Sequence, residues 1–107
     1  NVGSFFKNPV VRSEIADRLR DKFPGMPTYA HGDYTKIAAG WLIDRLGLKG
    51  QQIGGFAIND RQALVITNDG TGTADDLRDL VALILSSVEA TYGLSLAIEP
   101  TQLGRLN

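Results

Sequence analysis

Cysteine is missing from this 107-residue chain, which excludes disulfide bonds and thiolate chemistry and is consistent with a reducing compartment. Histidine is nearly missing: His31 is the single one, no set of further ligands lies near it in the sequence, and we therefore expect no metal site. Neither sign of charge is in excess, with 11 basic and 12 acidic residues. This balance gives no broad basic field for nucleic acid and no attraction to a membrane surface. An anionic ligand would have to be held by a few individually placed cations.

Long apolar runs and targeting signals are missing as well. No stretch reaches the ~18 apolar residues that a membrane span requires, and no signal-peptide pattern opens the chain. No linker or repeat divides the sequence, so residues 1–107 are predicted to form one domain with a single core. The first residue is Asn1 and not methionine. Because chain ends usually fray, a functional group near this end would be unusual, and we expect the chain to be part of a longer polypeptide.

The most informative segment that is present is 3–9, with the sequence Gly-Ser-Phe-Phe-Lys-Asn-Pro. Read as a strand, it places Ser4 and Phe6 on one face and Phe5 and Lys7 on the other. Pro9 is expected to end the pairing because it has no N–H to donate. A small hydroxyl would then be fixed between two rings, with an amide and a cation close behind. The alternative is an ordinary edge strand with a surface lysine.

Two helices are predicted in the first half of the chain from apolar residues at helical spacing. The first begins at Ser13, a suitable N-cap, ends before Pro24, and has an apolar face made of Ile15, Ala16, Leu19 and Phe23. Segment 23–34 contains two prolines and two glycines and is predicted to be a loop. The second helix opens at Lys36, ends at Gly47, and has an apolar face made of Ile37, Ala38, Trp41, Leu42 and Leu46.

A hairpin, a helix and a strand are predicted in the second half. Segments 56–58 and 63–67 alternate around a turn at 59–61. A third helix begins after Thr73 and ends at Gly93, with a buried face of Leu77, Leu80, Val81, Ile84, Leu85 and Val88. In a last strand, Leu94, Leu96 and Ile98 face the core, which places Glu99 on the opposite face. The predicted fold is α+β, a small sheet with a β-hairpin packed against about three helices.

Four blocks of the sequence together resemble one known family. They are the opening segment 3–9 and, after it, Ala38-Ala39-Gly40-Trp41-Leu42-Ile43, Leu48-Lys49-Gly50 and Ile53-Gly54-Gly55. In this order and at this spacing they resemble the C-terminal, substrate-binding domain of UDP-N-acetylenolpyruvoylglucosamine reductase, also called UDP-N-acetylmuramate dehydrogenase. The resemblance covers nearly the whole chain.

The resemblance implies part of a bacterial, cytoplasmic flavoenzyme of peptidoglycan synthesis. In that family NADPH reduces FAD, which is bound by preceding domains, and the flavin then reduces UDP-N-acetylglucosamine enolpyruvate to UDP-N-acetylmuramate. The FAD-binding domains are expected to be absent from this chain, so the isolated chain should bind no flavin and be inactive.

The resemblance also implies roles for individual residues. Ser4 matches the proton donor, and Glu99 matches the residue that stabilises the developing charge or acts as an acid. The residues that match contacts to the UDP-sugar are Asn8, Tyr29, Lys36 and Gln62. Without the resemblance, Glu99 would be a solvated glutamate at a strand end. Lys36 would be a first-turn lysine, mildly unfavourable beside the helix dipole unless a phosphate binds there.

Two functions of other classes remain open: a stand-alone nucleotide-sugar-binding module, and a structural domain without a ligand. Other signals in the sequence are weaker. Gly70-Thr71-Gly72 precedes a helix, but Asp75 stands where a phosphate-binding loop needs its third glycine. Ser4 with the distant His31 makes a poor hydrolase triad.

Overall fold

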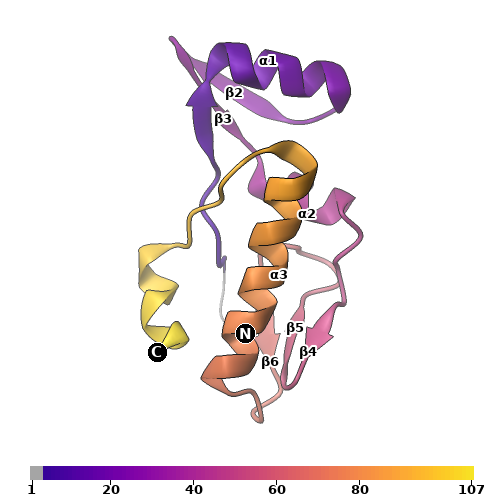
Figure 1. Ribbon diagram of the computed structural model, residues 1–107, viewed down its shortest axis with the longest axis vertical. Helices are drawn as coiled ribbons and strands as arrows, with labels where there is room; N and C mark the ends of the chain where they lie inside the picture. The colour runs from indigo at the N-terminus through magenta and orange to yellow at the C-terminus, as the bar shows by residue number, and fades with distance from the viewer. Residues whose placement is uncertain (1–3) are drawn as a thin grey trace.

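The computed structural model describes residues 4–107, and Figure 1 shows two small antiparallel sheets at opposite ends of an elongated domain of 43 × 25 × 21 Å. The predicted α+β class is confirmed. Residues 1–3, including Gly3 of the opening segment, lie outside the described part. In chain order the elements are β1 (Val10–Arg12), α1 (Ser13–Lys22), β2 (Thr28–His31), β3 (Tyr34–Ile37), α2 (Ala39–Arg45), β4 (Gln52–Ile53), β5 (Phe56–Ile58), β6 (Ile66–Asn68), α3 (Ala74–Tyr92) and a 3-10 helix (Pro100–Leu106).

The first sheet has the strand order β1-β3-β2, and α1 packs on one of its faces. The predicted loop at 23–34 is wrong in its second half, where Thr28–His31 forms β2 and pairs with β3. Gly32, with φ 61°, allows the tight turn between these strands, so this glycine joins two strands and does not mark a long loop. Ser13 is the first helical residue of α1 and not its N-cap; its hydroxyl instead hydrogen-bonds with that of Thr35, at 2.9 Å.

Lys36 is also placed differently from the prediction. It belongs to β3, and α2 begins only at Ala39, so the expected conflict between Lys36 and the helix dipole does not exist. The strand pairing sets Lys36 opposite Val10 on one side and Tyr29 on the other. Side chains of directly paired residues project from the same face of a sheet. Val10, Lys36 and Tyr29 are exposed, so this face of the sheet is the one that α1 leaves open.

The second sheet contains the predicted hairpin, with Ile58 paired to Ile66, and a short additional strand, β4. Its second strand begins at Ile66 and not at Ala63, because residues 59–65 connect the two strands and Val65 bridges to Ser4. The predicted third helix is confirmed as α3, which packs along this sheet (Figure 1). Thr73 and Asp76 form a reciprocal capping box at its start, and Gly93 ends it in the left-handed conformation, with φ 70°. Within residues 4–107, no helix combines the length and the apolar character needed to cross a membrane.

Residues 4–7 cross the interior between two other segments. The Phe5 amide donates to the Leu64 carbonyl (2.8 Å), and two residues further along the Lys7 amide donates to the Ala97 carbonyl (2.8 Å). Phe5 and Phe6 are 0% and 3% exposed, so both faces of this segment are buried, whereas Lys7 is exposed. The pairing of residues 4–7 ends before Pro9, as predicted, and residues 7–9 belong to no strand. The Pro9 carbonyl accepts from the Ile37 amide, and β1 starts at the next residue with β3 as a new partner.

The last predicted strand is extended but forms only one bridge, between Phe6 and Ile98. Its alternation is as expected at Leu94 and Leu96, which are buried while Ser95 and Ala97 are exposed; Ile98 and Glu99 are both half-buried. The core is continuous between the two sheets, and its largest fully buried side chains are Phe5, Ile37, Leu42, Ile43, Ile58, Ile66, Leu77, Leu80, Ile84 and Val88.

We predict that Gly55→Ala lowers the free energy of unfolding of the 107-residue chain by about 1–3 kcal/mol, the cost of overpacking. A Cβ at Gly55 would lie 2.6 Å from the Asp69 carboxylate and would overlap the backbone nitrogen of Gly72, which cannot move without displacing the turn before α3. Urea denaturation measures the change. Gly104→Ala, where a Cβ meets nothing within 4 Å, is the matched control and should stay within about 0.5 kcal/mol of the unsubstituted chain. Equal stability of the two variants would contradict the argument.

Candidate functional site

Three adjoining cavities bring the six predicted site residues to one part of the molecule. The central cavity, of about 520 Å³, is lined by four of them: Ser4, Asn8, Lys36 and Glu99. A second cavity, of about 410 Å³, shares Ser4 and Leu64 with the first and contains Gln62. A third, of about 400 Å³, shares Val10 and Lys36 with the first and contains Tyr29. Residues from position 4 to position 99 therefore line cavities that share lining residues.

Ser4 is held by its backbone, and its side chain is exposed in the central cavity. It forms a bridge with Val65, and its carbonyl accepts a hydrogen bond from the side-chain amide of Gln102, at 3.3 Å. Within residues 4–107, no hydrogen-bond partner holds the Ser4 hydroxyl. The hydroxyl is therefore available to a ligand in the cavity.

Glu99 reaches the same cavity because its segment pairs with residues 5–7. The Glu99 amide donates to the Phe5 carbonyl (2.9 Å), which sets Glu99 beside the residue that follows Ser4. Pro100 then starts the 3-10 helix and turns the chain away. Glu99 is half-buried, and no cation of the described part forms an ion pair with its carboxylate. Ser4 and Glu99 are thus brought together by backbone pairing.

Asn8 has a structural role that the sequence did not reveal. Its side-chain oxygen accepts a hydrogen bond from the Ala39 amide (2.9 Å), at the start of α2. Ala38, the N-cap residue of α2, has no side chain that could do this, so Asn8 caps the helix from outside. The nitrogen of the Asn8 amide has no partner among the described residues. It remains free to donate to a ligand in the central cavity.

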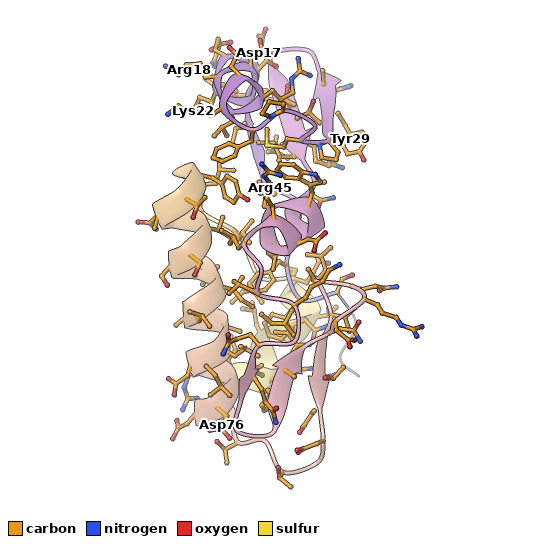
Figure 2. The ribbon with its side chains drawn as sticks, turned by 90° about the vertical axis from the view of Figure 1, so that its right-hand side faces the viewer. Asp17, Arg18, Lys22, Tyr29, Arg45 and Asp76 are labelled. Atoms are coloured by element: carbon orange, nitrogen blue, oxygen red, sulfur yellow. The ribbon has the colours of Figure 1, made fainter. Side chains whose placement is uncertain are left out.

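Lys36 and Tyr29 are cross-strand neighbours on the open face of the first sheet. Figure 2 shows Tyr29 on the opposite side of this end of the molecule from Arg18 and Lys22 of α1. Lys36 forms no ion pair with any described residue, whereas Arg20, on α1, lies 3.8 Å from Asp17. An unpaired lysine beside an exposed tyrosine can bind a phosphate group and a flat or sugar ring.

Gln62 lies in the turn between β5 and β6. The side-chain oxygen of Asn59 accepts from the amides of Arg61 and Gln62, at 2.8 and 2.9 Å, and fixes this turn. The second cavity is lined by Gln62 together with Arg61 and Lys49. The turn therefore presents an amide and a guanidinium to the same space.

Three further cations lie beside the predicted residues, and only Lys7 among them was noted from the sequence as a cation close to Ser4. They are Lys7 in the central cavity and Lys49 and Arg61 in the second. With Lys36 they face only two carboxylates, Glu99 and Asp44, of which Asp44 is paired with Lys49 at 3.0 Å. Positive charge is therefore in local excess at these cavities, where it favours an anion, although the net charge of the whole chain is −1. Lys49 belongs to the block Leu48-Lys49-Gly50, which was used only for the family resemblance. Its positive charge was the signal that could have placed it at an anion site.

Two titratable groups with shifted pKa values have structural explanations. The hydroxyl and amide of Thr71 donate to the Asp69 carboxylate and lower its pKa, in the turn before α3. Burial raises the pKa of Tyr92, whose hydroxyl donates to the Leu42 carbonyl and ties α3 to α2. Neither group lines the three cavities. Among residues 4–107, no cluster of three acidic or histidine side chains is placed to hold a metal ion.

Comparison with known proteins connects this arrangement to a family. Residues 1–103 match the model described as "UDP-N-acetylenolpyruvoylglucosamine reductase, C-terminal domain". The chain belongs to this family. The resemblance found in the sequence blocks is thereby confirmed.

Relatives named UDP-N-acetylenolpyruvoylglucosamine reductase agree with this family over almost all of the chain. The protein of Neisseria meningitidis serogroup A is 51% identical over 104 residues, which is 96% of this chain and 30% of the relative. The protein of Bordetella pertussis is 48% identical over 101 residues, 94% of this chain and 29% of its own length. That of Bdellovibrio bacteriovorus is 43% identical over 100 residues, 94% of this chain and 30% of its length. The chain thus spans about 30% of the length of these curated relatives.

Asn8 offers a test that separates its structural role from its contact with a ligand. Asn8→Ala should lower the free energy of unfolding by about 1 kcal/mol, because α2 loses a capping acceptor. Asn8→Asp keeps the acceptor and should remain close to native stability, but its negative charge faces Lys36 and Lys7 and should weaken binding of UDP. Urea denaturation and calorimetric titration measure the two effects, with Asn107→Ala as a control. An Ala variant as stable as the unsubstituted protein would contradict the capping role.

Proposed function

We propose that this domain binds the UDP-sugar substrate of an FAD- and NADPH-dependent reductase and supplies the groups that complete the reduction. The substrate is UDP-N-acetylglucosamine enolpyruvate and the product UDP-N-acetylmuramate, a precursor of bacterial peptidoglycan. One observation carries the proposal: the six residues assigned by family resemblance, scattered from position 4 to position 99, line adjoining cavities.

The described residues do not fit a flavin. The only glycine-rich turn before a long helix is 70–72 in this part of the chain, and a Cβ at Gly72 would overlap the ring of Phe56, so this glycine serves packing. Asp69 and Asp75 beside the turn would repel a diphosphate. FAD, and with it the reaction of NADPH, is therefore assigned to other domains of a longer polypeptide, which are the partners of this one.

The phosphates and the sugar are assigned to the cationic and amide groups. Lys36 is the unpaired cation between the central and third cavities, and a charge-assisted hydrogen bond to a phosphate oxygen suits it. Asn8 can donate its free N–H to the sugar-phosphate region, and Tyr29 can contact the nucleotide from the neighbouring strand. Gln62 adds a donor and an acceptor from the second cavity. Binding along the three cavities would orient the enolpyruvyl end toward Ser4 and Glu99.

The chemical step of this domain is a proton transfer. A reduced flavin held by the other domains would supply hydride to C3 of the enolpyruvyl group, and C2, next to the substrate carboxylate, would then need a proton. The Ser4 hydroxyl donates its proton to C2, forming the C–H bond, and the alkoxide left behind is reprotonated from solvent. Glu99, in the same cavity, stabilises the charge that develops on the substrate or acts as an acid toward it. Neither a stand-alone nucleotide-sugar-binding module nor a structural domain would need a hydroxyl and a carboxylate, here Ser4 and Glu99, in one cavity.

The experiment that tests the function uses the full-length polypeptide that contains this domain, with Ser4→Ala. Reduction of the flavin by NADPH should be unchanged, and its reoxidation by the UDP-sugar should slow by about 10²–10⁴, the contribution of one general acid. Stopped-flow absorbance of the flavin measures both half-reactions, and Ser4→Cys should keep part of the rate. A normal reoxidation rate in Ser4→Ala would exclude Ser4 as the donor. If the unsubstituted polypeptide binds the UDP-sugar but no flavin, the stand-alone binding module is the better description.

Lys36→Ala in the same polypeptide should weaken binding of the UDP-sugar by about 1.5–3 kcal/mol, the value of a charge-assisted hydrogen bond. The effect should appear in KM and shrink at high salt, because Lys36 is exposed. Lys22→Ala is the matched control, since this lysine is also exposed but lines a separate groove on α1 (Figure 2). Equal KM values for the two variants would contradict the role of Lys36.

A further inference from the structure

The geometry points to Gln102 as a positioning residue that fixes Ser4 and Glu99 relative to each other. This inference rests on the proposed function and extends it to a residue outside the six assigned by resemblance. Gln102 lies in the 3-10 helix Pro100–Leu106. It is 7% exposed and, with Thr35, is one of two polar residues buried in the described part of the chain.

Gln102 is bonded to the backbone of both proposed catalytic residues. Its side-chain nitrogen donates to the Ser4 carbonyl, 98 residues away in the sequence, at 3.3 Å. Its backbone amide donates to the Glu99 carbonyl at 2.9 Å. One residue thus holds the peptide that carries the hydroxyl and the peptide that carries the carboxylate. A buried amide side chain retains such bonds because leaving it unpaired costs about 1–3 kcal/mol.

Arg105 sets the direction in which the Gln102 amide points. The Nε of Arg105 donates to the side-chain oxygen of Gln102, at 2.7 Å. Arginine carries donors only, so it selects the oxygen end of the amide. The nitrogen end must then face Ser4, where a carbonyl needs a donor. Arg105 therefore acts on Ser4 through Gln102 and not by contact with the cavity.

The 3-10 helix itself is anchored to the long helix α3. The guanidinium of Arg78, on α3, donates to the Leu106 carbonyl, and the same side chain pairs with Asp75. Figure 1 shows this C-terminal turn lying beside α3 and the opening segment. Gln102 thus fixes the position of Ser4 relative to the core, because the 3-10 helix that carries Gln102 is bonded to α3. A displacement of about 1 Å at a reacting group can cost about 10²-fold in rate, so losing this bond should be felt in the proton transfer.

The test introduces Gln102→Met, which has a similar volume and no amide, into the full-length polypeptide. Flavin reoxidation by the UDP-sugar should slow by about 10- to 100-fold, while flavin reduction by NADPH and KM for the UDP-sugar change by less than about twofold. In a Ser4→Ala background the same substitution should cost no further rate, because Gln102 acts through Ser4. Arg105→Met should give a smaller loss in the same half-reaction, and Arg105→Lys should recover part of it.

Leu103→Gln, at an exposed position of the same 3-10 helix, is the control and should leave both half-reactions unchanged. Unaltered reoxidation in both Gln102→Met and Arg105→Met would overturn the inference while leaving the proposed function intact. Equal losses in both half-reactions, additive with Ser4→Ala, would also overturn it, because they indicate a general loss of stability. If Gln102→Met does not fold, the two Arg105 variants decide, since Arg105 is exposed. An unsubstituted polypeptide without reductase activity would instead contradict the proposed function.

Discussion

The structure depends on the pairing of residues 4–7 between two segments that are distant in sequence. Leu64 accepts from the Phe5 amide, and Ala97 accepts from the Lys7 amide. The two phenylalanine rings, 5.4 Å apart and edge to face, fill the core on both sides of this segment. The same pairing carries Ser4, Gln62 and Glu99 to adjoining cavities. Burial of two apolar rings therefore determines where the polar groups of the site lie.

Electrostatics then determines what the site can hold. A chain with nearly balanced charge has no long-range attraction for anions, so affinity must come from local placement. Lys7, Lys36 and Arg61 are not neutralised by any described carboxylate at ion-pair distance, although acidic residues are more numerous in the chain than basic ones. Among the other cations, Arg12, Arg20, Lys49 and Arg78 are paired with a carboxylate, as Arg12 is with Glu14 at 3.3 Å. This distribution suits a ligand with a diphosphate at one end and a carboxylate at the other.

Local signals predicted α3 and the β5–β6 hairpin, because a capping box, a long apolar repeat and a turn rich in Asn and Asp each determine structure within a few residues. They failed at β2, where Pro27 and Gly32 suggested a loop although pairing with β3 decides the conformation. They also failed at β3, whose Lys36 was assigned to a helix although this strand pairs with both β1 and β2. The six site residues came from family resemblance, and their proximity depends on tertiary contacts that periodicity does not contain. The sequence has no local pattern that predicts Asn8 as a helix cap or Gln102 as a buried hydrogen-bond donor, since their partners lie 31 and 98 residues away.

The site separates the groups that face a ligand from the groups that maintain the fold, with two exceptions. Ser4, Lys36 and Tyr29 have side chains without internal hydrogen bonds among the described residues, and their backbones are held by strand or bridge pairing. Such side chains can interact with a ligand at no cost to folding contacts. Asn8 and Gln102 differ, because each uses one end of an amide to hold another segment in place. An amide can do this because its oxygen and nitrogen have distinct partners. At Asn8 the nitrogen has no partner among the described residues and is available to the proposed ligand, and at Gln102 the nitrogen holds the backbone of Ser4, the proposed proton donor.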